Sequence, residues 1–600
     1  MLPISRIMTS ICFSVLAVNA QANKSDWVEK SDEYTRAILV SDADFFPETA
    51  SSTGMAEFDA RCLDLSLDLE ARVVASNNKN LATLSKALGK ETNSNIKQDL
   101  QLLIDAIEQA NDGMALEEQY LVPWEDVPRQ IFSGLSRLLD AQLPDERQQA
   151  ALSRLQCYIG GADSTPITEK SKERFQQKAG DQQLLGPNRE SVMQAIERVP
   201  AFIKGLNALF KERGIAGYEK PMAQLEMQLE DYVDWLNVSV LPRSREGFIL
   251  PAPLYAHRLK TMGIDIDPER LIENAKVSFM QTRGAMDALA LQIAAAEDSE
   301  VSDYRDVIRL LKEKPITVDN LESHYRSVNK ILEKAIADNK IVDLPKRDMI
   351  MRLASEAESA SQPAPHMLPP PFIGNKGEMG QFVLTAGNPN ASAGAVYDDF
   401  NFDAVAYTLS AHEGRPGHEL QFSAMLENGV SLARVYYAFN SVNVEGWALY
   451  AEAEMLPYEP LEGQMIALQH RLLRAARAML DPMLNLGRIT PEVATQFLLN
   501  EVVLSEAMTK QEVDRYTIRA PGQAGSYFYG YSRLLQMRAE TELALGDKFD
   551  RLAFNNFILA QGLLPPTIIA KAVREEFIGA VVETVAGPVK EAAVAPVKGK

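Results

Sequence analysis

Residues 411–421 of the chain read Ala411-His412-Glu413-Gly414-Arg415-Pro416-Gly417-His418-Glu419-Leu420-Gln421. Only six histidines occur among the 600 residues, and two of them stand here around a glutamate. Histidines four residues apart on a helix can share a metal ion, because they lie on one face, while an adjacent glutamate addresses the bound water. His412 and His418 are six residues apart, and at about 100° per residue a straight helix would turn them to different faces.

Pro416 and Gly417 lie between the two histidines and change this expectation. Proline removes a hydrogen bond of the helix, and glycine permits the backbone to bend. A local bulge can therefore bring His418 back to the side of His412, so that both ligate one metal. The alternative is a helix break with two solvated histidines, and this segment alone leaves both open.

A second segment, Val444-Glu445-Gly446-Trp447-Ala448-Leu449-Tyr450-Ala451-Glu452, favours the metal site. Glu445 follows His418 by 27 residues on an expected helix, and zinc peptidases of the Glu-ligand type take their third ligand from such a downstream glutamate. Glu452 lies seven residues further, on the same helical face. We expect Glu452 to be a solvated helix charge; the alternative is a hydrogen bond from Glu452 to a ligating imidazole.

A third segment reads Pro521-Gly522-Gln523-Ala524-Gly525-Ser526-Tyr527-Phe528-Tyr529-Gly530-Tyr531. Peptide hydrolysis at a metal needs a hydrogen-bond donor aimed at the developing oxyanion. One of the three tyrosines can supply that donor, although aromatic residues at this spacing more often pack in a core.

Together, the motifs HEGRPGHELQ, EGWALYAE and PGQAGSY resemble the bacterial family known as domain of unknown function 885, whose members are often described as exported or lipoprotein-like. The resemblance implies a largely helical fold and a zinc metallopeptidase of the Glu-ligand zincin type. It matches His412, His418 and Glu445 to the metal ligands. It also matches Glu413 to the general base and Tyr527 to the tyrosine of the family's PGQA-x-x-Y element. In our mechanism Tyr527 stabilises the oxyanion, and Tyr531 is the substitute donor.

The resemblance is collinear over residues 255–576 and weaker before them. Two positions depart from the family pattern: Glu419 stands where many relatives carry a second histidine, and Phe528 where a lysine is common. The first departure leaves the ligand set intact. Because the family is itself poorly characterised, the resemblance supports the metal site more strongly than any substrate.

Hydrophobic periodicity predicts helices over most of the chain. Apolar residues recur at three- and four-residue intervals across residues 59–241, and a long helix is expected over 268–297, with a helical pattern continuing to Asn339. Five prolines within residues 361–372 then exclude helix.

The best strand candidate is the run Gly380-Gln381-Phe382-Val383-Leu384-Thr385-Ala386-Gly387, after which helix resumes near Asp403. We therefore expect a mainly α, zincin-like fold with a small β-sheet next to the active-site helix. The strand at 381–385 can pair with an extended peptide through main-chain hydrogen bonds; the alternative is an ordinary structural strand.

Composition and charge exclude several classes of protein. The chain is 46% hydrophobic and 24% charged, too apolar for a disordered protein. Lys and Arg total 61 against 82 Asp and Glu, a net charge of −21. This argues against a nucleic-acid partner or an anionic membrane surface, since both need clustered positive charge. No segment beyond the N-terminus is apolar enough to span a bilayer.

Residues 1–22 are typical of a secretory signal, with Arg6 before a short apolar run that ends in small residues. A membrane anchor is the alternative, and lipid attachment at Cys12 is not expected because this cysteine lies inside the apolar run. Cys62 and Cys157 can form a disulfide in an oxidising compartment or remain buried thiols; both stay open.

The expected organisation is a signal peptide at 1–22, a helical N-terminal region at 23–241, a zincin-like catalytic region at 242–580 and a flexible tail at 581–600. The expected function is that of an exported, periplasmic metallopeptidase that binds Zn²⁺ and a peptide substrate. Two alternatives remain: a hydrolase of non-peptide amides or esters with the same metal site, and a non-catalytic periplasmic binding protein. Side-chain preference, oligomeric state and cleavage at an end or internally are not predictable from the sequence.

Overall fold

The computed structural model of the protein describes residues 25–161, 164–296, 300–387 and 397–580. In these residues the chain is mainly helical, with a three-stranded sheet, as the sequence predicts. The expected signal at 1–22 and tail at 581–600 lie outside the described residues. No described helix is long and apolar enough to cross a membrane.

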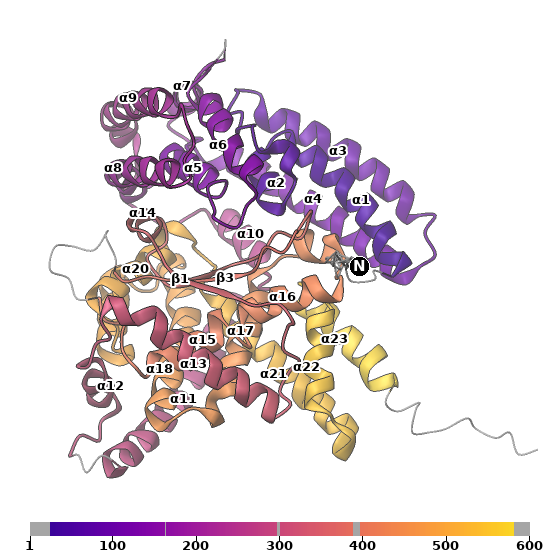
Figure 1. Ribbon diagram of the computed structural model, residues 1–600, viewed down its shortest axis with the longest axis vertical. Coiled ribbons are helices and arrows are strands. Elements are labelled where there is room, and N and C mark those ends of the chain that lie inside the picture. The colour runs from indigo at the N-terminus through magenta and orange to yellow at the C-terminus, as the bar shows by residue number, and fades with distance from the viewer. Residues whose placement is uncertain (1–24, 162–163, 297–299, 388–396, 581–600) are drawn as a thin grey trace, which may run out of the picture.

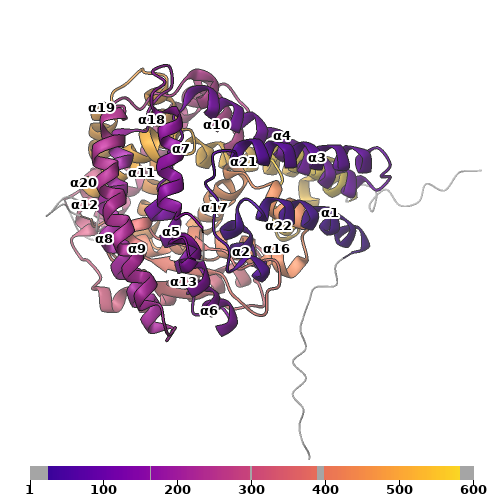
Figure 2. The ribbon, with the colours of Figure 1, turned by 90° about the horizontal axis from the view of Figure 1, so that it is seen from above.

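Helices α1 to α9 form an N-terminal layer, at the top of Figure 1. Their bounds are α1 (Asp26–Ala43), α2 (Pro47–Thr53), α3 (Leu69–Leu88), α4 (Ser94–Tyr120), α5 (Val127–Ser136), α6 (Asp145–Tyr158), α7 (Ile167–Ala179), α8 (Arg189–Glu212) and α9 (Glu219–Trp235), with short η segments at Ala56–Phe58, Leu236–Val240 and Leu241–Arg243. Helix α4 shows why they form: the Asn93 side chain caps its first turn, and Leu100, Leu103 and Ile107 bury one face. Figure 2 shows α3 and α4 side by side.

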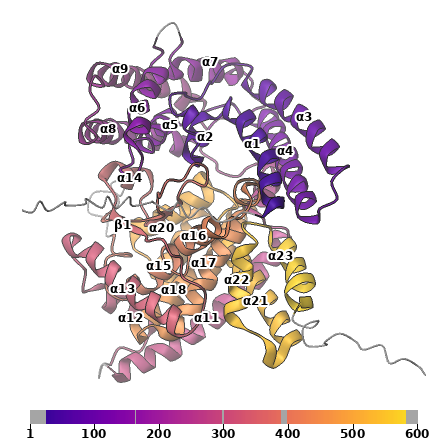
Figure 3. The same ribbon diagram turned by 45° about the vertical axis from the view of Figure 1, so that its right-hand side comes forward.

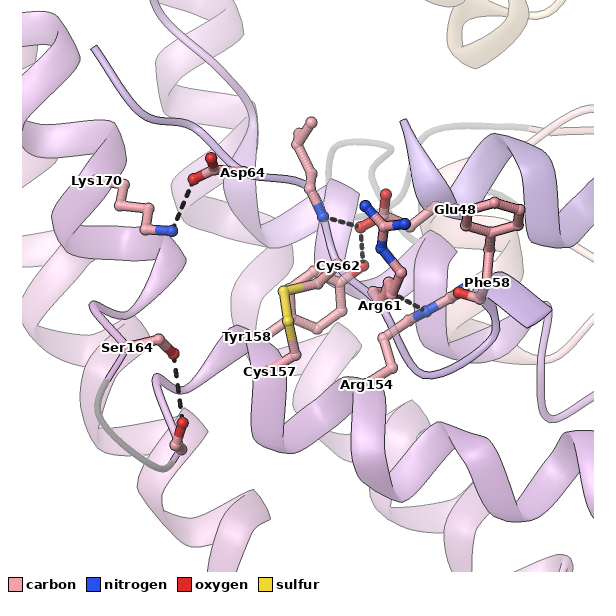
Figure 4. Close-up of a disulfide and its surroundings, with 12 residues drawn as sticks. Glu48, Phe58, Arg61, Cys62, Asp64, Arg154, Cys157, Tyr158, Ser164 and Lys170 are labelled. Atoms are coloured by element: carbon pink, nitrogen blue, oxygen red, sulfur yellow. Dashed lines mark hydrogen bonds and ion pairs between the residues drawn. A yellow bond between two sulfur atoms is a disulfide. The ribbon is translucent and has the colours of Figure 1, made fainter. Parts of the chain in front are cut away.

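A disulfide joins Cys62 to Cys157 inside this layer (Figure 4), which decides the open question of their pairing. Buried hydrogen bonds surround it. Glu48 accepts from the Tyr158 hydroxyl at 2.7 Å, and the Arg154 guanidinium donates to the Phe58, Arg61 and Gly134 carbonyls. The disulfide and this network tie α6 to the segment that precedes α3.

The C-terminal group contains the other helices and the sheet. Their bounds are α10 (Ala252–Met262), α11 (Pro268–Ala296), α12 (Tyr304–Lys312), α13 (Val318–Asp338), β1 (Ile350–Leu353), α14 (Glu356–Ser361), β2 (His366–Leu368), β3 (Gln381–Leu384), α15 (Val405–Glu413), α16 (His418–Asn428), α17 (Ser441–Met455), α18 (Leu461–Asn485), α19 (Pro491–Phe497), α20 (Glu506–Asp514), α21 (Gly525–Leu545), α22 (Arg551–Ala560) and α23 (Pro566–Ala572). Short η segments lie at η4 (Ala433–Tyr437), η5 (Leu456–Tyr458), η6 (Leu498–Val502), η7 (Arg515–Arg519), η8 (Gly546–Lys548) and η9 (Val573–Ile578).

Helix α18 is the centre of this group, buried on nearly all sides and packed along α11, with α15 and α21 against it. Helices α17 and α21 pack unusually closely through two glycines. A Cβ on Gly446 would lie 2.6 Å from the Gly530 carbonyl carbon, and a Cβ on Gly530 would lie 1.9 Å from the Val442 carbonyl oxygen. These two helices can approach this far only because neither glycine has a side chain.

The sheet lies between the N-terminal layer and the helices of the C-terminal group (Figures 1 and 3). Its strand order is β1-β3-β2, with β3 parallel to β1 and antiparallel to β2. The predicted strand is confirmed as β3, but β3 is the central strand and all four residues are buried. Its main-chain groups already pair on both sides, so of the two alternatives the structure favours the ordinary structural strand. Strand β2 is an edge strand.

Two apolar cores support the two parts of the molecule. One gathers buried residues between Leu65 and Val240, and the larger one gathers buried residues from Leu250 to Val573. Each core also takes one residue from the other part: Ala357 of α14 joins the first, and Leu102 of α4 joins the second. The cores therefore interlock, and the division at residue 241 stays a prediction.

A buried carboxylate also connects the two parts. Asp99 on α4 accepts hydrogen bonds from Ser31, Ser431 and Arg434 at 2.6 to 2.9 Å, and Arg434 belongs to the segment η4 between α16 and α17. The N-terminal layer therefore holds the connection between the helices that carry the candidate site.

Candidate metal centre

The segment around Pro416 breaks the helix completely. Helix α15 ends at Glu413 and α16 begins at His418, with a cis peptide bond between Arg415 and Pro416. Gly417 is required by close approach, since a Cβ on it would lie 1.9 Å from the His412 carbonyl oxygen. The predicted change of backbone direction is thus confirmed, as a break between two helices rather than as a bulge in one.

This break turns both imidazoles toward Glu445 on α17. Glu445 Oε2 lies 3.5 Å from His412 Nε2 and 3.3 Å from His418 Nε2. One ligand atom from each of the three residues lies within 4.8 Å of the other two, and among the described residues this is the group found with such geometry. Ligand atoms on a tetrahedral zinc ion are about 3.3 Å apart, so the spacing fits such an ion.

A buried carboxylate oxygen without a hydrogen-bond partner also favours a metal ion at this point. Glu445 Oε2 is buried and accepts no hydrogen bond of normal geometry. An orphaned buried carboxylate oxygen is costly, and a cation between it and two imidazole nitrogens would remove that cost. The donor set of two nitrogens and one oxygen is one that zinc accepts with a fourth position open.

Glu452 contacts His412 at the ring nitrogen that faces away from Glu445. Its Oε1 lies 2.6 Å from His412 Nδ1, its Oε2 accepts from Thr408, and Arg474 lies 3.3 Å from it. Only 2% of the residue is exposed, so the expectation of a solvated helix charge is wrong: this face of α17 points into the molecule. A proton on Nδ1 shared with Glu452 leaves Nε2 of His412 free for a metal.

The charges of this pair depend on each other. Burial alone would raise the pKa of Glu452, but Arg474 and His412 lower it to about 2. Burial alone would lower the pKa of His412, but Glu445 and Glu452 raise it to about 9 in the metal-free protein. A metal ion would therefore displace a proton from His412 when it binds.

Glu413 lies beside the three candidate ligands. Its Oε1 is 3.9 Å from His412 Nε2, and its side chain lines a cavity of about 370 Å³ that His412, His418 and Glu445 also line. A carboxylate here is within reach of a water molecule held at the same point, as a general base must be.

Tyr527 of α21 lines the same cavity, and its ring is stacked 6.2 Å from the His412 ring. Burial is the largest influence on this tyrosine and raises the pKa of its hydroxyl, which therefore stays protonated and able to donate. Tyr531 does not line the cavity; the Arg471 guanidinium lies 5.5 Å from its ring centre.

With this geometry in place, the relatives of the chain can be compared. Residues 47–573 match the family described as "Bacterial protein of unknown function (DUF885)". The chain belongs to this family. No curated protein matches it.

Two solved structures share the fold of this family member. One is a candidate lipoprotein of unknown function from Shewanella oneidensis, with a TM-score of 0.69 and 19% identity over 92% of this chain and 100% of that chain. The other is a candidate lipoprotein from Colwellia psychrerythraea, with a TM-score of 0.74 and 17% identity over 92% of this chain and 99% of that chain. At such identities the likeness concerns the fold alone.

The two departures from the family pattern fall outside the ligand group. Glu419 is fully buried and accepts from Arg415 Nε at 2.6 Å and from the Ser423 hydroxyl at 2.6 Å, which fastens the connection after α15 to the start of α16. The Trp447 indole holds the same connection by donating to the Pro416 carbonyl at 3.0 Å. Phe528 packs in the larger apolar core.

Sequence reasoning missed a set of basic residues at the cavity. Arg474 and Arg477 on α18 and Arg515 on η7 line it, together with His470. Arg471, Arg474 and Arg477 recur every three residues on one helix, and this basic spacing was the available indication. Nothing local in the sequence connects them with Arg515 or with the histidines.

Proposed function

We propose that this family member is an exported zinc-dependent metallopeptidase that hydrolyses peptide bonds with an activated water. The observation that carries the proposal is the convergence of His412, His418 and Glu445 on one point, with Glu413 beside it in a buried cavity. Such an arrangement, with three protein ligands and one open position, is typical of catalytic rather than structural zinc sites.

Each side chain has a defined task in this mechanism. His412, His418 and Glu445 would hold the ion, and Glu452 keeps His412 in the ligating tautomer. Zinc, when bound, polarises the scissile carbonyl and makes water acidic enough to be deprotonated near neutral pH. Glu413 then accepts a proton from water and returns it to the leaving amine. The Tyr527 hydroxyl donates to the oxygen on which negative charge develops.

The edge of the sheet offers a place for the peptide main chain. Pro365, His366 and Met367, at strand β2, line the cavity, and among the described residues β2 has a strand partner on one side only. An extended peptide can pair with an edge strand through main-chain hydrogen bonds. Strand β2, rather than the central strand β3, would then pair with the peptide.

Export is supported by two independent features. The disulfide between Cys62 and Cys157 is typical of proteins from oxidising compartments, and both solved neighbours are described as candidate lipoproteins. The signal expected at residues 1–22 fits the same location, the periplasm. Lipid anchoring is the alternative that the neighbours favour.

Metal analysis and two substitutions test the proposal. Purified protein should contain about one zinc ion per chain. Glu413→Gln should keep the zinc and lower peptide hydrolysis by at least about 100-fold, because it removes the base but no ligand. Glu445→Ala should lose the zinc. Unchanged hydrolysis by Glu413→Gln would remove the proposed base, and normal zinc content in Glu445→Ala would remove the third ligand.

The same preparation separates the alternatives. A hydrolase of non-peptide amides or esters would contain zinc and cleave acylated small molecules but not a peptide library. A non-catalytic binding protein would lack both stoichiometric zinc and hydrolysis.

A further inference from the structure

The cavity that contains the candidate metal ligands has a cationic group around Tyr527. The guanidinium carbons of Arg474, Arg477 and Arg515 lie 5.8, 4.6 and 5.9 Å from the centre of the Tyr527 ring, and all three residues line the cavity. All three side chains are largely buried. A buried charge is stable only when it is paired with an opposite charge.

The protein supplies partners for two of the three. Arg477 donates to both oxygens of Glu512, at 2.6 and 2.7 Å. Arg474 lies 3.3 Å from a carboxylate oxygen of Glu452 and donates to the His470 carbonyl. Each of these carboxylates is also used by another group, Glu512 by the Tyr516 hydroxyl and Glu452 by His412.

Arg515 is the guanidinium without an adequate partner. Its nearest carboxylate oxygen, on Glu512, is 3.7 Å away, already receives Arg477, and makes no hydrogen bond with Arg515. Arg515 Nη1 is buried with no hydrogen-bond partner, while 16% of the side chain is exposed and the residue lines the cavity. A buried donor without an acceptor costs free energy, so an anion bound in the cavity would give this guanidinium the partner that the described residues do not supply.

The acidic residues of the cavity do not supply that acceptor. Glu413 and Glu445 lie at the metal ligands. Asp399 already accepts from Lys312 at 2.7 Å and from the Ser505 hydroxyl. The part of the cavity next to Arg515 therefore carries positive charge in excess.

We propose that Arg515 binds the free C-terminal carboxylate of a peptide, so that the enzyme removes short fragments from peptide C-termini. This inference rests on the proposed function and specifies its substrate. A guanidinium matches a carboxylate in shape, because two parallel N–H groups meet two oxygens. In the reaction the peptide C–N bond breaks, water adds its hydroxyl to the acyl carbon, and its proton goes to the released amine.

The distance from the ligands limits the length of the released fragment. Tyr527 is close to both groups: its ring centre lies 6.2 Å from that of His412 and 5.9 Å from the Arg515 guanidinium carbon. These two distances place the guanidinium within about 12 Å of the imidazole. An extended chain covers about 3.3–3.6 Å per residue, so at most three residues fit between the cleaved bond and the bound carboxylate.

The first experiment measures binding without turnover. Zinc-loaded Glu413→Gln is titrated by calorimetry with an acetylated tetrapeptide of uncharged side chains, once with a free C-terminus and once as the C-terminal amide. The free acid should bind roughly 10- to 100-fold more tightly, the range expected for a charge-assisted pair. Equal affinity of acid and amide would overturn the inference, and this comparison needs no arginine variant to fold.

The second experiment assigns the preference to one residue. Adding Arg515→Met should lower the affinity for the acid to that of the amide and leave the amide unchanged, while Arg515→Lys should retain part of the preference. Arg471→Met is the matched control, because Arg471 lies on α18 outside the cavity lining; it should keep the full preference. Retention of the full preference in Arg515→Met would overturn the role of Arg515.

Products of the unsubstituted protein separate this inference from the proposed function. Mass spectrometry should find fragments of one to three residues released from C-termini, and slow cleavage of the amidated peptides. Internal cleavage that ignores the C-terminus would overturn the inference and leave the metallopeptidase intact. A preference for the free acid in binding with no cleavage of any peptide would leave the carboxylate site and remove the proposed reaction.

Discussion

At the scale of single residues, two glutamates on one helix have different tasks. Glu445 presents an unpartnered oxygen to two imidazole nitrogens, whereas Glu452 holds the far nitrogen of His412 and lies against Arg474. The two glutamates are seven residues apart, on one face of α17. The surroundings, not the residue type, separate a ligand from a residue that positions a ligand.

Replacing Glu452 tests this difference. Glu452→Gln keeps the volume but removes the charge that orients His412, so zinc affinity should fall about 10- to 100-fold while zinc binding itself persists. Competition against a chromogenic chelator measures the affinity, and circular dichroism reports the fold. Unchanged affinity in a folded variant would contradict the assignment, and Glu462→Gln, on α18, serves as a control expected to have no effect.

Glu459 offers a prediction about pH. Both of its carboxylate oxygens are buried without hydrogen-bond partners, and burial, with a contribution from Glu452, raises its pKa to about 8 from the ordinary value of 4.5. Between these two values the folded protein holds a proton that the unfolded chain releases. The free energy of unfolding should therefore decline as pH rises through this window.

Glu459→Gln removes that dependence because the amide is neutral at every pH. Relative to the parent protein, the variant should gain about 2–5 kcal/mol between pH 5 and pH 9, measured by urea unfolding at both values. If the difference between variant and parent is the same at pH 5 and pH 9, Glu459 is already ionised in the folded protein at pH 5.

At the scale of elements, the site depends on how closely α17 and α21 approach. Gly446 follows the candidate ligand Glu445, and Gly530 lies one turn after Tyr527. The contact between these two glycines thus sets the distance between the carboxylate and the tyrosine. A side chain at either position would separate the helices.

Gly530→Ala tests this packing. The added methyl group would meet the backbone at Val442 and Gly446, which cannot move aside as a flexible side chain could. We expect the free energy of unfolding to fall by about 1–3 kcal/mol, together with weaker zinc binding. Gly284→Ala is the matched control: Gly284 is also inside a helix, α11, but a Cβ there meets nothing within 4 Å, so this variant should be at least as stable as the parent. Equal effects of the two substitutions would contradict the role of the contact.

At the scale of the whole molecule, the N-terminal layer supports the site without contributing a candidate ligand. Its connection through Asp99 reaches Arg434 in the segment between α16 and α17, and the disulfide stabilises the layer itself. Because the candidate ligands all lie in the C-terminal group, we expect that the layer can be made less stable without removing any of them.

Removal of the disulfide tests this expectation. Cys62 and Cys157 are 95 residues apart, and closing a loop of this length is worth about 4–5 kcal/mol in the chain-entropy model. The double variant Cys62→Ser, Cys157→Ser should unfold at lower urea concentration by a corresponding amount, while the folded protein retains its zinc. Loss of zinc before unfolding would show that the layer acts on the site directly.

Predictability differed between local and distant features. The change of backbone direction at Pro416 was predictable because it depends on neighbours in the sequence, whereas His412, His418 and Glu445 were named as a candidate set from residue type, spacing and family resemblance. The exposed position expected for Glu452 was wrong, since α17 is surrounded by other helices and its pattern gives little sign of which face is inside. The central position of β3 was also not predicted. It depends on pairing with β1 and β2, which the local sequence of β3 does not specify.

The sequence by itself determined that the chain is helical and where its helix breaks, and it named the side chains that are candidates to hold a metal ion. Only the tertiary structure decided that Glu445 meets both imidazoles and that Arg474 and Arg515 gather around Tyr527. Helix periodicity and turn chemistry act over a few residues and can be read locally. Which helices become neighbours is decided by packing among residues that are far apart in the chain, and no local pattern contains that information.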